Sequence, residues 1–202
     1  NDLSERLIPE LSRAAENISP GNGSVVALDW INGRRTPDAN QALKGALTGL
    51  DMGSDAPAIF RALVESTAFG AKCIMERFRE EGVRIDGVIG LGGVAKKSPF
   101  IMQVLADIME TDIQVARAEE TCALGAAMFA ATAAGIHDTV DTAQQAMGHG
   151  FEAVYTPDKS RAGIYRDLYA QYLDLGDFDG TVKSSMKTNE EGDPACRSMI
   201  ER

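Results

Sequence analysis

The sequence is poor in the residues that disulfide frameworks and metal centres need. It has three cysteines, Cys73, Cys122 and Cys196, which lie far apart with no CxxC pair, and only two histidines. Disulfide frameworks normally use an even number of cysteines, and zinc sites use clustered Cys and His. We therefore expect neither a disulfide framework nor a zinc site, and the thiol content fits a reducing cytoplasm.

The sequence also lacks an excess of positive charge and a long hydrophobic run. Its 202 residues carry 20 Lys and Arg against 30 Asp and Glu, a net charge of −10. A phosphate-backbone binder needs clustered positive charge, so we expect no nucleic-acid partner. The uncharged run 121–136 is mostly Ala and Gly and too weakly hydrophobic to span a membrane. Residues 1–18 carry charge throughout and are no secretory signal.

Strand-like and helix-like segments alternate along most of the chain, which predicts an α/β fold with right-handed crossovers and a partly parallel sheet. We expect an N-terminal helix (3–17) and linker over 1–24, one domain over 25–178, and a polar, frayed tail over 179–202. Within the domain, the expected strands are 25–30, 46–50, 87–91 and 112–116, and the expected helices are 55–81, 99–110, 122–135 and 155–175. Ligands of such sheets bind beyond the carboxyl ends of the strands.

The expected helix 122–135 is apolar on every side. Residues 121–136 contain no charge, and seven of them are Ala. A helix without a polar face must be covered all round, and small residues allow close packing on a sheet. We therefore expect neighbours on both of its faces.

A glycine pair follows the expected strand 87–91 in the segment VIGLGGVAKKSPF (88–100). Gly92 and Gly93 have no Cβ, so a flat base or a ribose can approach the backbone closely. A helix beginning near Ser98 would direct free N–H groups toward the same crevice, and Lys96 and Lys97 add positive charge suited to phosphates. The alternative interpretation is a tight turn followed by solvated lysines.

Two common nucleotide motifs do not match this segment. A Walker A loop needs GxxxxGK[ST], and a dinucleotide loop needs GxGxxG, whose third Gly is missing here. The strand that follows ends in Val115-Ala116-Arg117, without the acidic residue that would bind a ribose. A dinucleotide-dependent oxidoreductase is therefore disfavoured.

Several segments together carry a more specific signal. In order and spacing they resemble the C-terminal domain of the FGGY carbohydrate kinases, over about residues 25–175, and the stretch from TGL to RALVES resembles that family's second signature. The DW-x-NGRRTP and ETCALGAA runs resemble the ribulokinases more closely than the xylulokinases or glycerol kinases. The segments are LDWINGRRTPDAN (28–40), LTGLDMGSDAPAIFRALVESTAFGAK (47–72), IGLGGVAKKSPFIMQVLADI (89–108) and ETCALGAAMFAATAAGI (120–136).

The resemblance implies an actin-like ATPase (ribonuclease H-like) fold. It also implies an enzyme that uses ATP and Mg²⁺. The γ-phosphoryl group would pass to a sugar hydroxyl, in the ribulokinase case giving ribulose 5-phosphate, with the pentulose held by an N-terminal domain. Gly92 and Gly93 match the family's adenosine loop. Gly93 and Val94 would contact adenine, and Lys96, Lys97 and Ser98 would lie near the base or ribose.

The sequence also departs from the family pattern. The sugar-binding domain, its catalytic Asp, and the first strands of the C-terminal domain with their phosphate-binding hairpin are not found in it. Asp29, Asp51, Asp55 and Asp86 do not lie in the context of that base. We therefore expect that this chain alone does not phosphorylate a sugar, and that uncovered apolar surface favours a homo-oligomer. A xylulokinase-like or glycerol-kinase-like member and a non-catalytic nucleotide-binding or interaction module remain alternatives.

Several other side chains invite a functional interpretation, but we expect structural roles for them. Arg34 and Arg35 are suited to phosphate, yet loop arginines often bind carbonyls. Trp30 is expected to anchor the core or a domain interface, with a sugar-stacking platform as the alternative. Glu65 lies in a helix, and Cys73 lies among small apolar residues, where a thiol packs as a small hydrophobe.

Overall fold

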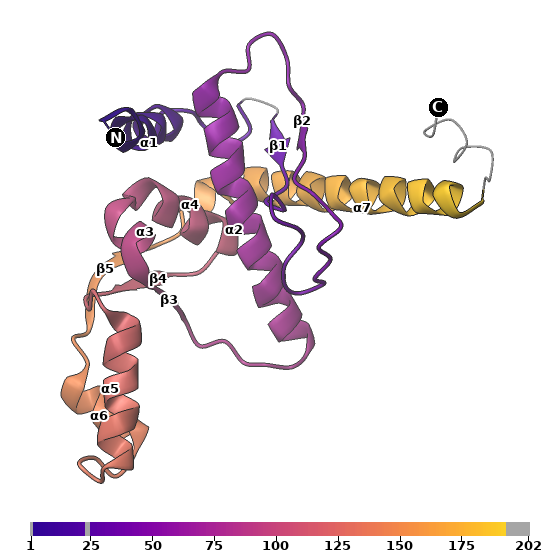
Figure 1. The fold of residues 1–202 in the computed structure, drawn as a ribbon. Helices are drawn as coiled ribbons and strands as arrows, with labels where there is room; N and C mark the ends of the chain where they lie inside the picture. The colour runs from indigo at the N-terminus through magenta and orange to yellow at the C-terminus, as the bar shows by residue number, and fades with distance from the viewer. Residues whose placement is uncertain (1, 23–24, 193–202) are drawn as a thin grey trace.

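A computed structural model describes residues 2–22 and 25–192, and Figure 1 shows their arrangement. In this part of the chain, helices surround two small sheets. The elements are α1 (Asp2–Glu16), β1 (Val26–Ala27), β2 (Leu47–Thr48), α2 (Ala56–Glu80), β3 (Val88–Gly90), α3 (Gly92–Lys97), α4 (Pro99–Met109), β4 (Ile113–Ala116), α5 (Thr121–Ala133), α6 (Val140–Met147), β5 (Phe151–Tyr155), a 3-10 turn η1 (Lys159–Arg161) and α7 (Ala162–Gly192). None of the described helices is long and apolar enough to cross a membrane.

The larger sheet has the order β3-β4-β5. β3 and β4 are parallel, with Gly90 opposite Val115, and α3 and α4 form the crossover between them. Ile113 and Val115 of β4 are fully buried and alternate with exposed Gln114, as a strand with one buried face requires. The predicted parallel pair is therefore confirmed.

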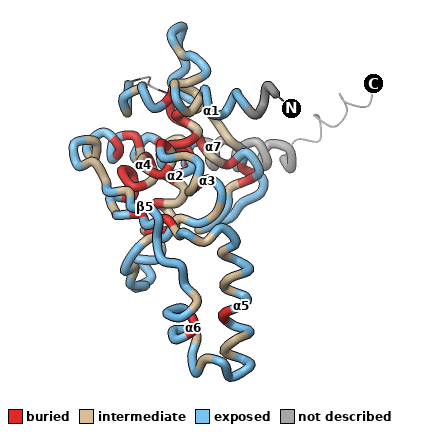
Figure 2. The backbone as a smooth tube through the Cα atoms, turned by 90° about the vertical axis from the view of Figure 1, so that its left-hand side faces the viewer, coloured by how far each residue is buried: buried red, intermediate tan, exposed pale blue. Residues whose placement is uncertain are grey.

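Helix α2 is the centre of the main body (Figures 1 and 2). Its start follows from local chemistry, because the Asp55 side chain accepts a hydrogen bond from the Ala58 N–H (2.9 Å) and a proline occupies the first turn. Ala68 and Phe69 of α2 are buried in one cluster with Val104 and Ile108 of α4. This apolar face fixes α4 on α2.

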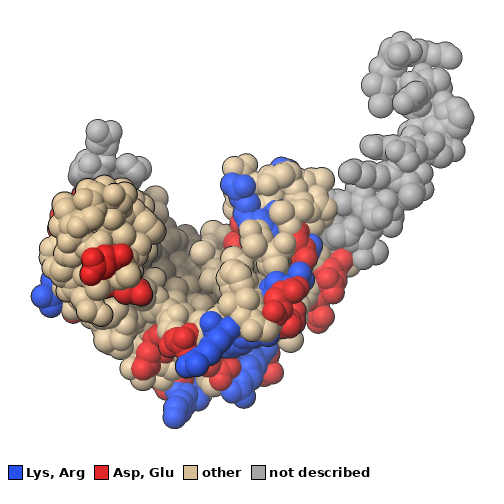
Figure 3. All heavy atoms as spheres, turned by 90° about the horizontal axis from the view of Figure 1, so that it is seen from below, with Lys and Arg blue, Asp and Glu red and all other residues tan. Residues whose placement is uncertain are grey.

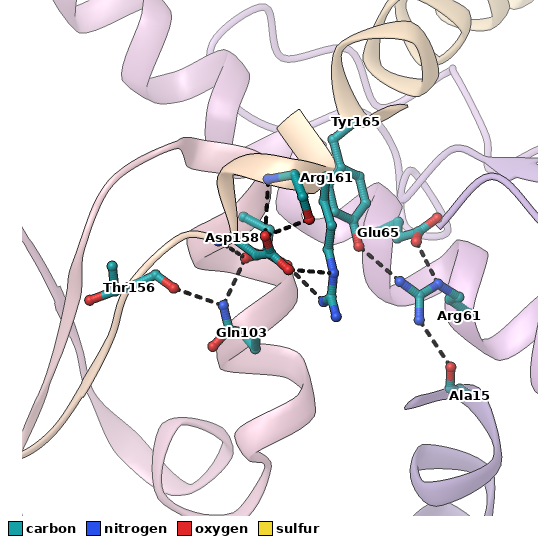
Figure 4. Close-up of polar contacts among 10 residues, drawn as sticks. Ala15, Arg61, Glu65, Gln103, Thr156, Asp158, Arg161 and Tyr165 are labelled. Carbon is teal, nitrogen blue, oxygen red and sulfur yellow. Dashed lines mark hydrogen bonds and ion pairs between the residues drawn. The ribbon is translucent and has the colours of Figure 1, made fainter. Parts of the chain in front are cut away.

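A buried guanidinium joins four helices at one end of that core (Figure 4). Arg61 of α2 is 5% exposed and forms an ion pair with Glu65 (2.8 Å). It also donates to the Ala15 carbonyl of α1 (3.0 Å) and to the Tyr165 hydroxyl of α7 (2.8 Å), and its guanidinium lies 5.6 Å from the Phe100 ring centroid of α4. Burial raises the pKa of Glu65, and the Arg61 charge opposes that rise. The structural role predicted for Glu65 is confirmed.

A second buried carboxylate, that of Asp107, ties α4 to the segment that leads into α7, and Figure 4 labels its partners Gln103, Asp158 and Arg161. Asp107 accepts hydrogen bonds from the Gln103 amide (2.7 Å), the Asp158 N–H (2.8 Å) and the Arg161 guanidinium (3.0 Å). Because Asp107 is almost fully buried, these donors replace the water that an ionised carboxylate would otherwise need.

Helices α5 and α6 project from the body as a separate lobe, which shows few charged side chains in the view of Figure 3. The prediction that the Ala-rich helix is covered on all sides is wrong for the described chain. Within α5 only Met128 is buried, and Phe129 is 64% exposed. α6 is its principal neighbour and covers one side, so the rest of this apolar surface faces solvent.

The helix predicted over 155–175 is also partly wrong. Residues 151–155 form β5, which pairs antiparallel with β4, and a 3-10 turn capped by the Asp158 side chain precedes α7. The α7 backbone continues to Gly192, past the residue where a frayed tail was expected, because no proline interrupts it. Residues 193–202 of that expected tail lie outside the described residues, so the boundary at 178 stays a prediction.

Replacing Arg61 with Met should destabilise the chain strongly. The substitution leaves the Glu65 carboxylate buried without its partner, which typically costs about 3–5 kcal/mol of unfolding free energy. Urea unfolding measures the loss. Arg79→Met, on an exposed residue of the same helix, is the matched control and should change the free energy by less than about 0.5 kcal/mol. Equal effects of the two variants would contradict the role given to the buried pair.

Candidate functional site

The glycine pair lies at the carboxyl edge of the parallel strands. Gly92 and Gly93 follow β3, and Arg117 follows β4, so both connections leave the sheet at the same edge. Leu91 is extended, and α3 begins at Gly92, whose φ is +81°. Crevices at this edge are where sheets of this kind bind ligands.

The local geometry explains the need for glycine and leaves room for a ligand. A positive φ at Gly92 is a conformation that other residues rarely adopt. A Cβ on Gly92 or Gly93 would meet no heavy atom within 4 Å, so the space beside the pair is open. Val94 is 59% exposed next to it. A flat apolar base can therefore reach this backbone and cover the Val94 side chain.

Helix α3 is held rigidly beneath this open space. Ala95 is buried in one cluster with Met75 of α2, Met102 of α4 and Val115 of β4. A Cβ on Gly90 would come within 2.8 Å of the Met102 methyl group, so the strand and α4 are in close contact. The glycine loop is thus held in place by the packing of Ala95 and Gly90 against the core.

Lys96 and Lys97 occupy the last turn of α3, where the negative end of the helix dipole stabilises their positive charge. Lys96 donates to the Arg117 carbonyl (2.6 Å) and lies 3.5 Å from a Glu152 carboxylate oxygen, so it joins α3 to β4 and β5. Lys97 is exposed and has no hydrogen bond or ion pair within the described residues. A role for either lysine beside the base or ribose stays a prediction.

Ser98 caps α4, as the sequence predicts, because its hydroxyl accepts the Ile101 N–H (3.4 Å). The expectation that this helix start supplies free N–H groups at the crevice is wrong in one respect. A short helix, α3, lies between the strand and α4, so the helix that begins at the strand end starts at Gly92. The segment with Lys96 and Lys97 is therefore helical.

The start of α5 is a part of this edge that sequence reasoning missed. α5 begins directly after the β4 connection, and its N-cap residue, Glu120, makes no side-chain cap. Uncapped N–H groups at a helix start are suited to phosphate oxygens, although the charges of Glu119 and Glu120 oppose an anion there. The predicted parallel pairing of the two strands could have indicated that the start of α5 lies at this edge, because parallel strands have their carboxyl ends at the same edge of the sheet.

The four aspartates that do not lie in the sequence context of the family's catalytic base each have a local partner. Asp55 caps α2, Asp51 accepts from the Gly53 N–H (2.8 Å), Asp86 pairs with Arg84, and Asp29 accepts from the Tyr172 hydroxyl (2.9 Å). Among the described residues no group of three or more His, Cys, Asp or Glu side chains could hold a metal ion. Within the described residues, this edge therefore carries no cluster of metal-binding side chains.

The structural roles expected for Trp30 and Arg34 are confirmed. Trp30 is buried in the main core cluster. The Arg34 guanidinium lies 5.3 Å from the Trp30 ring centroid and donates to the Asp38 carbonyl (2.6 Å). Cys73 is half-buried and lies 3.2 Å from the Tyr169 hydroxyl. Arg35 differs from these residues, because it is exposed and has no partner in the described part of the chain.

Comparison with known proteins gives this edge its context. The sequence model described as "FGGY family of carbohydrate kinases, C-terminal domain" matches residues 4–134. The chain belongs to the FGGY family of carbohydrate kinases. Its FGGY relatives include a ribulokinase of Vibrio parahaemolyticus, 44% identical over 192 residues, and one of Bacillus licheniformis, 38% identical over 181 residues. The matches cover 95% and 88% of the chain but 34% and 33% of the relatives, so it spans about a third of their length.

Solved FGGY kinases show the fold. A xylulose kinase from Rhodospirillum rubrum matches with a TM-score of 0.73 at 23% identity, over 85% of this chain and 34% of that one. A Plasmodium falciparum glycerol kinase solved with ADP matches with a TM-score of 0.68 at 23% identity, over 86% and 35%. The predicted α/β, actin-like architecture is confirmed, and the chain forms part of a domain of this kind. Membership of the FGGY family excludes the oxidoreductase alternative.

Replacing Gly92 with Ala should weaken adenosine binding by about tenfold. A Cβ at φ of +81° strains the turn by roughly 1 kcal/mol or more, and relief of that strain would move the backbone that meets the base. Isothermal titration with adenosine measures the effect. Gly87→Ala is the matched control, since Gly87 precedes the same strand, has no positive φ, and a Cβ there would meet nothing within 4 Å. Unchanged affinity in Gly92→Ala would contradict the assignment.

Proposed function

We propose that this chain is the adenosine-binding part of an ATP-dependent kinase that converts ribulose to ribulose 5-phosphate. The observation that carries the proposal is the open glycine pair at the carboxyl edge of β3 and β4. The choice of ribulose is supported by relatives named ribulokinase at 44% and 38% identity, against 23% for the solved xylulose and glycerol kinases.

The chain's own residues would hold one end of ATP. The positive φ of Gly92 turns the backbone away from the strand, so that Gly93 and Val94 meet adenine, with Lys97 and Ser98 beside the base or ribose. Phosphoryl transfer depends on in-line positioning of the γ-phosphate and on neutralisation of its charge. A fixed adenosine contributes the positioning, because Ala95 anchors α3 in the core.

The remaining components of the reaction would come from outside the described residues. We propose that the pentulose and the catalytic base belong to the two thirds of the relatives' length that this chain does not span. The family's use of ATP implies Mg²⁺, and among the described residues no group of three or more His, Cys, Asp or Glu side chains could hold a metal ion. We therefore assign none of these residues to the metal. The spaced thiols suggest a cytoplasmic setting.

Nucleotide titration separates this proposal from a complete kinase. Adenosine, ADP and ATP should bind the 202-residue chain with affinities within about threefold of one another, because the contacts lie at the adenosine end. An ATP-coupled assay with ribulose should give no turnover. Absence of adenosine binding would contradict the site. Ribulose-dependent conversion of ATP to ADP by this chain would contradict the proposal that the sugar site and the catalytic base lie outside it.

We also propose that the exposed apolar side of α5 drives self-association of this chain. Phe129→Glu places a charge on that surface and should raise the dissociation constant at least tenfold in sedimentation equilibrium. Phe178→Glu is the matched control, because Phe178 lies on α7 and is 67% exposed against 64% for Phe129. A clean monomer at high concentration, or equal effects of both variants, would contradict this interface.

A further inference from the structure

A second hollow, apart from the glycine pair, lies between the 29–38 loop, α2 and α7. Its volume is about 370 Å³, within the range of small-molecule sites. Its wall is formed by Asp29, Trp30, residues 33–38, Thr67, Gly70, Ala71, Cys73, Ile74, Tyr172, Leu173, Gly176 and Asp177, and no residue from 88–98 contributes to it. The cavity is therefore distinct from the proposed adenosine site.

Close approaches to glycine shape this cavity. A Cβ on Gly70 would lie 2.7 Å from the Asp29 Oδ2 atom, and a Cβ on Gly176 would lie 2.8 Å from the Trp30 ring. These glycines let the loop that carries Asp29 and Trp30 approach α2 and α7 directly. The loop is thus held against both helices, and the Asp29 carboxylate lies at the cavity wall.

One end of the cavity is a hydrogen-bond acceptor. The Asp29 Oδ1 atom accepts from the Tyr172 hydroxyl (2.9 Å), and no Lys or Arg among the described residues forms an ion pair with this carboxylate. Burial raises the pKa of Asp29, and the Tyr172 hydrogen bond opposes that rise. A half-buried carboxylate without a counter-charge is stabilised by further donors, such as the hydroxyls of a ligand.

The same wall carries a cation that the described residues leave unpaired. Arg34 is committed to Asp38 and to the Trp30 ring, and Arg77 also pairs with Asp38 (3.2 Å). Arg35 lines the cavity and has no hydrogen bond or ion pair in the described part of the chain. A guanidinium in this position is suited to a phosphate or a carboxylate.

We propose that this cavity binds a small polyhydroxylated anion, of the sugar phosphate or sugar acid class. Its hydroxyls would donate to Asp29, its anionic group would pair with Arg35, and its C–H faces would lie on Ala71 and Ile74. An amine would satisfy Asp29 but leave Arg35 unpaired. A bare anion would pair with Arg35 but meet the Asp29 carboxylate without donors, so a molecule with both groups fits best.

The chain offers its own probe, because Trp30 is its single tryptophan and lines the cavity. Titrating the 202-residue chain with ribose 5-phosphate and with gluconate should give a saturable change in tryptophan fluorescence with at least one of them. Ribose alone and inorganic phosphate alone should each bind at least tenfold more weakly. Adenosine should not compete, so failure here is distinguishable from failure of the nucleotide site.

Two variants assign the ends of the ligand. Asp29→Asn keeps an oxygen for Tyr172 but removes the charge, and Arg35→Gln removes the cation from an exposed position where folding is not at risk. Each should weaken binding at least tenfold, whereas Asp112→Asn and Arg79→Gln, at exposed positions outside the cavity, should not. Circular dichroism and melting check that the fold is kept.

Three results would overturn the proposal. One is no saturable fluorescence change with either polyhydroxylated anion. Another is equal binding of inorganic phosphate, which would indicate charge attraction alone. The third is binding that Arg35→Gln leaves unchanged while the variant stays folded. Binding of only the sugar phosphate or only the sugar acid supports the proposal and identifies the class.

Discussion

One buried guanidinium holds together the helices on which both candidate sites rest. Arg61 reaches a carbonyl of α1, a carboxylate of its own helix and a hydroxyl of α7, and it stacks on an aromatic ring of α4. These contacts fix the position of α2. Residues of α2 then pack against α4 and α3 in the core, and other α2 residues form part of the cavity wall. Arg61 itself touches neither candidate site, and its role is to position the elements that do.

The parts of the fold that local chemistry specifies could be predicted from the sequence. Ser98 caps α4 where the sequence places the start of a helix, and the alternation in β4 predicts its buried face. β5 was not predicted because this strand forms by pairing with β4, and that pairing cannot be inferred from residues 151–155 alone. The exposure of α5 was not predicted for a related reason, since burial depends on what lies beside a helix as well as on its own composition.

By itself, a strand followed by two residues without Cβ predicts no more than a tight turn. The resemblance of the neighbouring segments to the FGGY kinases is what makes the glycine pair a candidate adenosine site. What the structure adds is that Gly92 has positive φ, that the space beside it is open, and that Lys96 is already engaged with β4 and β5. The second cavity could not have been found in this way. Asp29 and Tyr172 are 143 residues apart in the chain, and the packing of α7 against β1 and α2 brings them together.

We propose that the β3–α3 connection binds adenosine without help from the rest of a kinase. A backbone amide NMR titration of this chain with adenosine tests this. We expect saturable shifts centred on residues 91–98, with smaller shifts at 117–121 on the neighbouring connection. Saturable shifts confined to the lining of the second cavity, or no saturable shifts at any adenosine concentration, would contradict it.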